Sequence, residues 1–147
     1  MKNIILANKN IYLEPFNGKT KQIKKLFTML NNRKYNISND SKTDYENHLK
    51  FCEKNPYRKW FLIKLKSKYI GSLFITYQNE VSINLETPDM DTYASILNMV
   101  LKNIKPLRAI PSVRNKSFVC NTNPKNKTLK QALKNMDSIK IQESYVL

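Results

Sequence analysis

Glycine, cysteine and histidine are scarce in this chain of 147 residues, which contains two Gly, two Cys and one His. Cys52 and Cys120 stand far apart and form neither a disulfide framework nor a zinc motif, so we expect a reduced protein without a metal site. No apolar run approaches the about 20 residues that a membrane span needs. The N-terminus lacks an apolar region followed by a small-residue cleavage site. We therefore expect a cytoplasmic protein with no membrane partner.

Acidic residues are also few, since 11 Asp+Glu face 26 Lys+Arg and the formal net charge is +15. Of the basic residues, 22 are Lys and 4 are Arg, although Arg is the side chain that phosphate and guanine recognition favours. Lys, Asn and Ile, which share A/T-rich codons, together make up 55 of the 147 residues. We interpret the charge mainly as a compositional bias and rank nucleic-acid binding below other functions.

Apolar periodicity predicts one α+β domain over residues 1–147. The expected strands are 11–16, 60–65, 69–77, 81–86, 118–121 and a terminal strand at 139–147. The expected helices lie around 23–30, from a cap at 41–44 to about 55, over 93–104 with Asp91 as the N-cap, and over 129–136. This order predicts a mixed, mostly antiparallel central sheet with helices on both faces, in α/β-type layers.

Four stretches of the chain resemble successive parts of one known family. They are Asp44–Phe51, Tyr69–Leu73, Val81–Leu85 and Asn121–Asn126. In this order they are similar to the second helix, the third strand, the fourth strand and the fifth-strand region of the GCN5-related N-acetyltransferase (GNAT) superfamily. The first stretch resembles the branch that acts on small metabolites and sugar amines. The resemblance covers roughly residues 11–147 and implies an acyl-CoA N-acyltransferase fold.

The resemblance implies acetyl-CoA as the cosubstrate, held between the fourth and fifth strands of the sheet. The pantetheine arm would pair with main chain of the fourth strand, and the pyrophosphate would sit on amides at the start of the next helix. The cofactor-binding residues implied are Ile83, Leu85, Glu86, Asp91, Thr92, Tyr93, Ala94, Ser95, Asn121 and Asn126.

The expected pyrophosphate loop departs from the family pattern of Gln/Arg, two residues, Gly, one residue, Gly/Ala. Aligning Ala94 with the last small position puts Thr92 at the first glycine and Asp89 at the Gln/Arg. Glycine allows backbone to approach phosphates closely, whereas Thr92 is branched and Asp89 and Asp91 add negative charge beside an anion. Both aspartates have the alternative role of capping the helix. The resemblance therefore implies a divergent family member that lacks the glycine-rich loop.

Acetyl transfer to an amine needs a base that deprotonates an ammonium and an acid that returns a proton to the sulfur. Glu80 and Glu86 flank the fourth strand, where the family often keeps its base, and Tyr145 and Tyr93 are candidate acids. Each also has a structural interpretation, because charges at strand ends are usually solvated and tyrosines on apolar faces usually pack in cores. His48 either lines an acceptor pocket or packs within the protein.

Two functions stay open. The first is an acetyl-CoA-dependent N-acetyltransferase that transfers the acetyl group to the amine of a small acceptor by direct attack. The alternative is a catalytically degenerate binding protein of the same fold, which uses its basic surface for an acidic partner or nucleic acid. Residues Tyr57–Trp60 interleave basic and aromatic side chains, as in base stacking, but also fit the start of a buried strand. A homodimer stays open as well.

Overall fold

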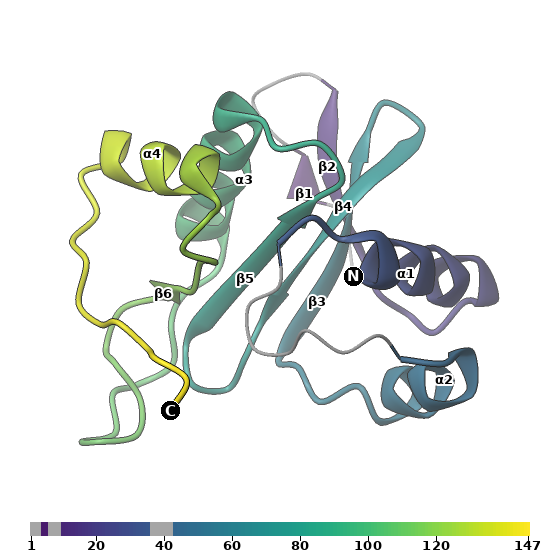
Figure 1. Ribbon diagram of the computed structural model, residues 1–147, viewed down its shortest axis with the longest axis horizontal. Coiled ribbons are helices and arrows are strands. Elements are labelled where there is room, and N and C mark those ends of the chain that lie inside the picture. The colour runs from purple at the N-terminus through teal and green to yellow at the C-terminus, as the bar shows by residue number, and fades with distance from the viewer. Residues whose placement is uncertain (1–3, 6–9, 36–42) are drawn as a thin grey trace.

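Six strands form one sheet and four helices pack against it within the residues that the computed structural model describes, which are 4–5, 10–35 and 43–147 (Figure 1). In chain order the elements are β1 (Ile4–Ile5), β2 (Ile11–Pro15), α1 (Thr20–Asn32), α2 (Tyr45–Lys54), β3 (Lys59–Leu65), β4 (Lys68–Ile75), β5 (Glu80–Leu85), α3 (Met90–Asn103), β6 (Val119–Cys120) and α4 (Lys127–Asn135). No helix in these ranges is long and apolar enough to cross a membrane.

The strands follow one another across the sheet in sequence order, from β1 to β6. Each of the first five is antiparallel to its neighbours among them, and β6 pairs parallel with β5 after the chain has crossed over through α3. The β3–β4 hairpin turns at Lys66, which has a left-handed φ of 57°. The predicted mixed, mostly antiparallel sheet is confirmed.

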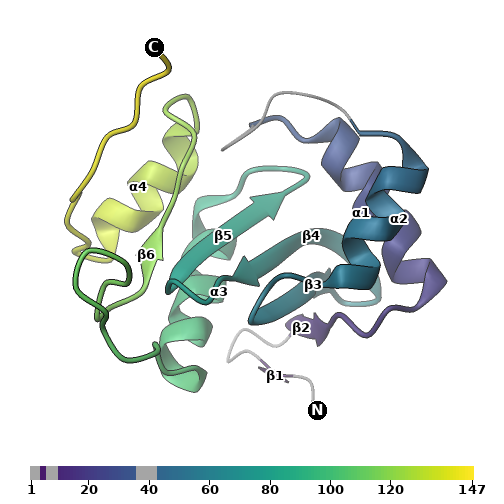
Figure 2. The ribbon, with the colours of Figure 1, turned by 90° about the horizontal axis from the view of Figure 1, so that it is seen from below.

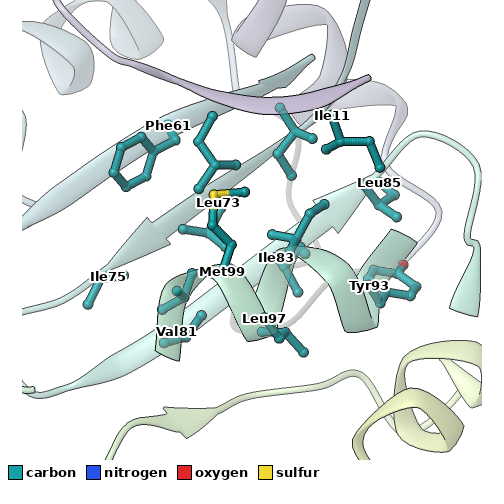
Figure 3. Packing of buried hydrophobic residues seen from close by; sticks show 14 of the residues in the cluster. Ile11, Phe61, Leu73, Ile75, Val81, Ile83, Leu85, Tyr93, Leu97 and Met99 are labelled. Atoms are coloured by element: carbon teal, nitrogen blue, oxygen red, sulfur yellow. The ribbon is translucent and has the colours of Figure 1, made fainter. Parts of the chain in front are cut away.

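The two faces of the sheet bury two separate clusters, because adjacent residues of a strand point to opposite sides. Phe61 packs in the larger cluster with residues of α3 and α4, whereas Leu62 packs in the smaller one with residues of α1 and α2. Figures 1 and 2 show these two pairs of helices on opposite sides of the sheet. Figure 3 shows Met99 of α3 against Leu73 of β4 and Ile83 of β5. The helices therefore cover both faces, as the sequence predicts.

The N-cap of α2 agrees with the sequence prediction, whereas the N-cap of α3 is a different residue from the one predicted. Asp44 caps α2 by accepting the N–H of Asn47 at 2.8 Å; residues 41–42 of the predicted cap lie outside the described ranges. At α3 the prediction of Asp91 is wrong, because Asp91 lies inside the first turn. Asp89, with an extended backbone, caps this helix instead.

The predicted terminal strand at 139–147 is also wrong, since this segment forms no strand. The side chains of Ile139 and Tyr145 are 85% and 78% exposed. Alternation of apolar residues produces a strand only where a neighbouring strand completes the hydrogen-bond ladder and a core covers the apolar face. Neither is present here, and local contacts, such as the Tyr145 hydroxyl donating to Glu143, take their place.

Candidate functional site

A cleft of about 400 Å³ opens on the face of the sheet that carries α1 and α2. Its floor is the polar face of β4 and β5, where Ser72, Ser82 and Asn84 alternate with buried residues. One wall comes from α1, α2 and the start of β3, and the opposite wall is the segment that joins β6 to α4. The cleft therefore lies beside the junction of β5 and β6.

Strands β5 and β6 separate at this junction to form a fork. They pair at only two positions, Glu80 with Val119 and Val81 with Cys120. The last hydrogen bond between them is donated by the N–H of Asn121 to the carbonyl oxygen of Val81, at 3.3 Å. Beyond it the chain leaves β5 and leads into α4 (Figure 2).

Main-chain groups of β5 beyond Val81 point into the fork. The Glu80 carbonyl and the Glu86 N–H bond toward β4, so the alternation of the ladder turns the groups of Ile83 and Leu85 toward the β6 side. Over the described part of the chain, no backbone hydrogen bond reaches Ile83 or Leu85 from that side. Ile83 is 3% exposed, and unpaired buried amides call for a partner. The fork thus offers a main-chain edge to an extended ligand.

Asn126 stands at the base of the wall that faces α1 and α2. Its side-chain oxygen accepts the N–H of Leu129 at 3.1 Å and so caps α4. Its amide nitrogen donates to the hydroxyl of Tyr93 at 3.4 Å. Tyr93 is 1% exposed, and burial raises the pKa of its hydroxyl. Asn126 lines the cleft, whereas Tyr93 is a core residue that holds Asn126 from behind.

At the start of α3, where the resemblance implies a pyrophosphate site, the carboxylate of the N-cap residue Asp89 accepts hydrogen bonds from the first turn of the helix. Asp89 accepts both the N–H of Thr92 at 2.9 Å and its hydroxyl at 2.6 Å. The side-chain hydrogen bond from Thr92, and then the backbone one, lower the pKa of Asp89. Asp91 is exposed, and Thr92, Ala94 and Ser95 are half-buried. These residues do not line the cleft.

The candidate bases and acids are not brought together, and Tyr93 is a core residue. Glu80 is exposed and lines the cleft at the paired end of the fork, opposite Val119. Glu86 lies beyond the other end of β5 and forms an ion pair with Lys25, with a nitrogen–oxygen distance of 2.7 Å. Tyr145 lies in the exposed C-terminal segment, outside the cleft lining.

His48 combines the two interpretations that the sequence left open. It is 4% exposed and its Nε2 donates to the carbonyl oxygen of Ile23 at 3.0 Å, yet it lines the cleft. Burial lowers the pKa of the imidazole, so the ring is neutral at pH 7. The bond to Ile23 uses the Nε2 proton and leaves Nδ1 as the acceptor nitrogen.

An aromatic wall, formed by Phe51, Tyr57, Trp60 and Phe74, is the part of the cleft that sequence reasoning missed. Tyr57 stacks on Phe74 with ring centroids 3.9 Å apart and meets Trp60 edge to face at 5.0 Å. A signal for Phe51 was present, since the three-residue spacing from His48 puts both on one helix face.

The basic and aromatic residues of Tyr57–Trp60 do not form one nucleic-acid surface. The Arg58 guanidinium donates to the carbonyl oxygen of Lys105 at 2.9 Å, after the end of α3, whereas Tyr57 and Trp60 line the cleft.

Within the described ranges, no group of three or more His, Cys, Asp or Glu side chains is placed to hold a metal ion. Arg33 and Glu80 are the charged side chains that line the cleft.

Comparison with solved structures relates this arrangement to acetyltransferases. RimL, a ribosomal L7/L12 α-N-protein acetyltransferase solved with coenzyme A, superposes with a TM-score of 0.63 at 13% identity, over 91% of this chain and 82% of that one. A Salmonella typhimurium acetyltransferase that modifies the N-terminal serine of L7/L12 has a TM-score of 0.54, 16% identity and coverages of 91% and 83%. The microcin C7 self-immunity acetyltransferase MccE, solved with acetyl-CoA and AMP, has a TM-score of 0.51, 16% identity and coverages of 86% and 77%.

The likeness lies in the fold and not in the sequence. No protein-family model matches the chain, and a search of curated proteins finds no match. Identities of 13% and 16% to these structures show a common architecture only. The chain therefore has the GNAT fold, as the four sequence stretches predicted.

Proposed function

Starting from this acetyltransferase fold, we propose that the protein is an acetyl-CoA-dependent N-acetyltransferase. The observation that carries the proposal is the fork, where unpaired main chain of β5 faces the cleft. The pantetheine arm, an extended chain with two amides, would pair with the groups of Ile83 and Leu85 as an added strand does at a sheet edge. RimL was solved with coenzyme A and MccE with acetyl-CoA, which supports this choice of ligand.

The proposed reaction is direct attack of an amine on the thioester. A bond forms between the amine nitrogen and the acetyl carbon, the carbon–sulfur bond breaks, and its electron pair leaves with the sulfur. The nitrogen releases one proton as it becomes an amide, and the sulfur takes up one proton to become a thiol. Glu80 is the carboxylate that lines the cleft, and we assign to it the removal of a proton from the substrate ammonium, directly or through water. Glu86 is less suited, because its carboxylate is paired with Lys25.

We further propose that the acceptor is a small amine bound between Glu80 and the aromatic wall. Aromatic faces and a carboxylate both favour an ammonium group, and a cleft of about 400 Å³ has the size of a small-molecule site. A polyamine suits this protein poorly, because the net charge of +15 repels a polycation. RimL acts on a ribosomal protein, so a peptide N-terminus belongs in the acceptor screen beside aromatic amines and amino sugars.

A thermal-shift titration with acetyl-CoA, supported by calorimetry, tests the donor half of the proposal. A ligand bound by the folded state alone stabilises it by about 2.7 kcal/mol at a hundred times its Kd, so the melting temperature should rise with concentration. The absence of both a shift and a heat signal at millimolar acetyl-CoA would exclude the transferase. Salt-dependent binding of short DNA would then favour the basic binding protein.

The variant Glu80→Gln tests the assigned base, with Glu143→Gln as the matched control. Both carboxylates are exposed, but Glu143 lies in the C-terminal segment outside the cleft. We expect Glu80→Gln to bind acetyl-CoA normally and to lose about a hundredfold or more in acetyl transfer, as measured by release of free thiol. Equal turnover of the two variants would rule out Glu80 as the base.

A further inference from the structure

We infer that the donor site recognises the acetyl-pantetheine part of its thioester and gains little from the nucleotide diphosphate. The donor class is then a pantetheine thioester in general, of which acetyl-CoA is one member. This inference rests on the proposed function and concerns the same fork. It comes from two observations, the acidic start of α3 and the hydroxyl and amide side chains along the floor and the β6–α4 wall of the cleft.

The start of α3 has lost the two properties that make a helix N-terminus bind phosphate. Such a site needs unoccupied N–H groups and a favourable potential for an anion. The N–H and hydroxyl of Thr92 are both donated to the Asp89 carboxylate, at 2.9 and 2.6 Å. The exposed Asp91 in the same turn adds a second negative charge. A diphosphate placed there would meet two carboxylates and would have to displace one of them.

The cleft itself is suited to a neutral, amide-bearing chain. Its floor and its β6–α4 wall present hydroxyl and amide side chains, among them Ser82, Asn84, Thr122 and Asn126. Pantetheine carries amides and a hydroxyl and no charge, so these side chains and the fork's main chain complement it. The residues from Asp89 to Ser95 do not line the cleft. Recognition of the donor is therefore concentrated on the arm.

Calorimetric titration of the full chain with acetyl-CoA and with S-acetyl-pantetheine tests the inference. We expect the two Kd values to agree within about tenfold. The net charge of +15 favours the more anionic ligand, so agreement cannot come from long-range attraction. A Kd for acetyl-CoA more than tenfold lower overturns the inference and leaves the proposed function intact. If neither ligand binds, the proposed function fails.

A variant that removes both negative charges provides a second test of the inference. In Asp89→Ser/Asp91→Asn the serine still caps α3, because serine is an effective N-cap, while both charges are gone. We expect the Kd for acetyl-CoA to fall by about two- to fivefold per charge removed, and the Kd for S-acetyl-pantetheine to stay unchanged. Equal affinities of variant and native protein for acetyl-CoA would overturn the part of the inference that assigns the weak diphosphate contribution to Asp89 and Asp91.

The matched control is Asp44→Ser. Asp44 caps α2 with the same contact, a carboxylate oxygen 2.8 Å from the N–H three residues on, so the control loses a like charge and keeps a like cap. We expect it to leave the ratio of the two Kd values unchanged. A ratio shifted equally by both variants would point to overall charge and overturn the assignment to α3.

Discussion

The fork between β5 and β6 and the start of α3 are the two parts of one expected donor site, but only the fork has the geometry that the resemblance implies. At the fork the geometry suits a pantetheine arm, with pairing that ends at Val81 and unpaired main chain at Ile83. At α3 the expected phosphate site holds the carboxylate of Asp89 instead. The two parts lie on successive elements of the chain, since β5 ends at Leu85 and α3 begins at Met90.

The difference follows from what each part requires of the side chains. Main chain at a strand edge is available whatever the side chains are, provided that the neighbouring strand diverges. An anion site at a helix N-terminus also requires backbone that can approach closely and no competing carboxylate. Substitutions at the start of such a helix can therefore abolish a phosphate site without altering a strand edge.

The largest expected effect comes from Gly71→Ala, which breaks the fork and leaves the start of α3 intact. A Cβ at Gly71 would clash with the carbonyl oxygen of Asn84 and lie 3.1 Å from the Cα of Leu85, so β4 and β5 must move apart. We expect roughly 3 kcal/mol of destabilisation in urea unfolding. We also expect at least a tenfold loss of acetyl-CoA affinity, because the Leu85 main chain is displaced.

The other glycine of the chain provides the control. Gly18→Ala introduces a side chain at a φ of 81°, but in an exposed turn with nothing within 4 Å. We expect a loss of about 1 kcal/mol from backbone strain and no change in binding. If Gly71→Ala bound acetyl-CoA as tightly as Gly18→Ala does, the donor could not pair with β5 at Leu85.

An intermediate effect is expected from Asn126→Ala, which tests whether α4 supports the fork. The variant loses the cap of α4 and the contact with Tyr93, and we expect a loss of about 1–2 kcal/mol of unfolding free energy. Asn126→Ser should recover most of that stability, because serine restores the cap. Acetyl-CoA affinity recovering together with stability would limit Asn126 to a structural role.

The smallest effect is expected from Asp89→Ala, and it depends on pH. The hydrogen bonds from Thr92 depress the pKa of Asp89 in the folded protein, so its contribution to stability is complete above the ordinary pKa and is lost as the pH falls through the depressed value. We expect the variant to be less stable by about 1 kcal/mol at pH 7.

Urea unfolding at several pH values measures this difference. It should shrink below about pH 4 as the carboxyl of the native protein is protonated. A difference that stays constant down to pH 2 would show that the cap does not depend on the ionised carboxylate of Asp89, and the charge argument for α3 would weaken with it.

Periodicity predicted most of the fold correctly, because each predicted element except the last has a neighbour that buries its apolar face. Strand β5 alternates Val81, Ile83 and Leu85 with polar residues, and all three are buried. The same alternation at Ile139 and Ile141 failed, since both are exposed and no strand pairs with them. Alternation in the sequence describes a single strand, but a strand forms only where a second strand pairs with it.

The candidate site was less predictable than the fold. The resemblance pointed to Ile83, Asn121 and Asn126, and all three line the cleft. It also pointed to Leu85, Glu86 and residues 91–95, which lie outside the lining. The candidate acid Tyr145 lies outside it as well, and the sequence reasoning gave no place to the aromatic wall. Which side chains face one cavity depends on how α1 and α2 lie across the sheet, and no local pattern in the chain contains that information.

The sequence by itself determined most of the elements between residues 11 and 136 and the apolar face that each one buries, because the spacing of apolar side chains is a local property. It also determined that no glycine stands at the start of α3. Only the tertiary structure decided that β6 leaves β5 after two pairs and that Asp89, not Asp91, is the N-cap of α3. Both depend on the course of the backbone in space, since a strand edge stays unpaired only if its neighbour turns away and a carboxylate caps a helix only from an extended residue.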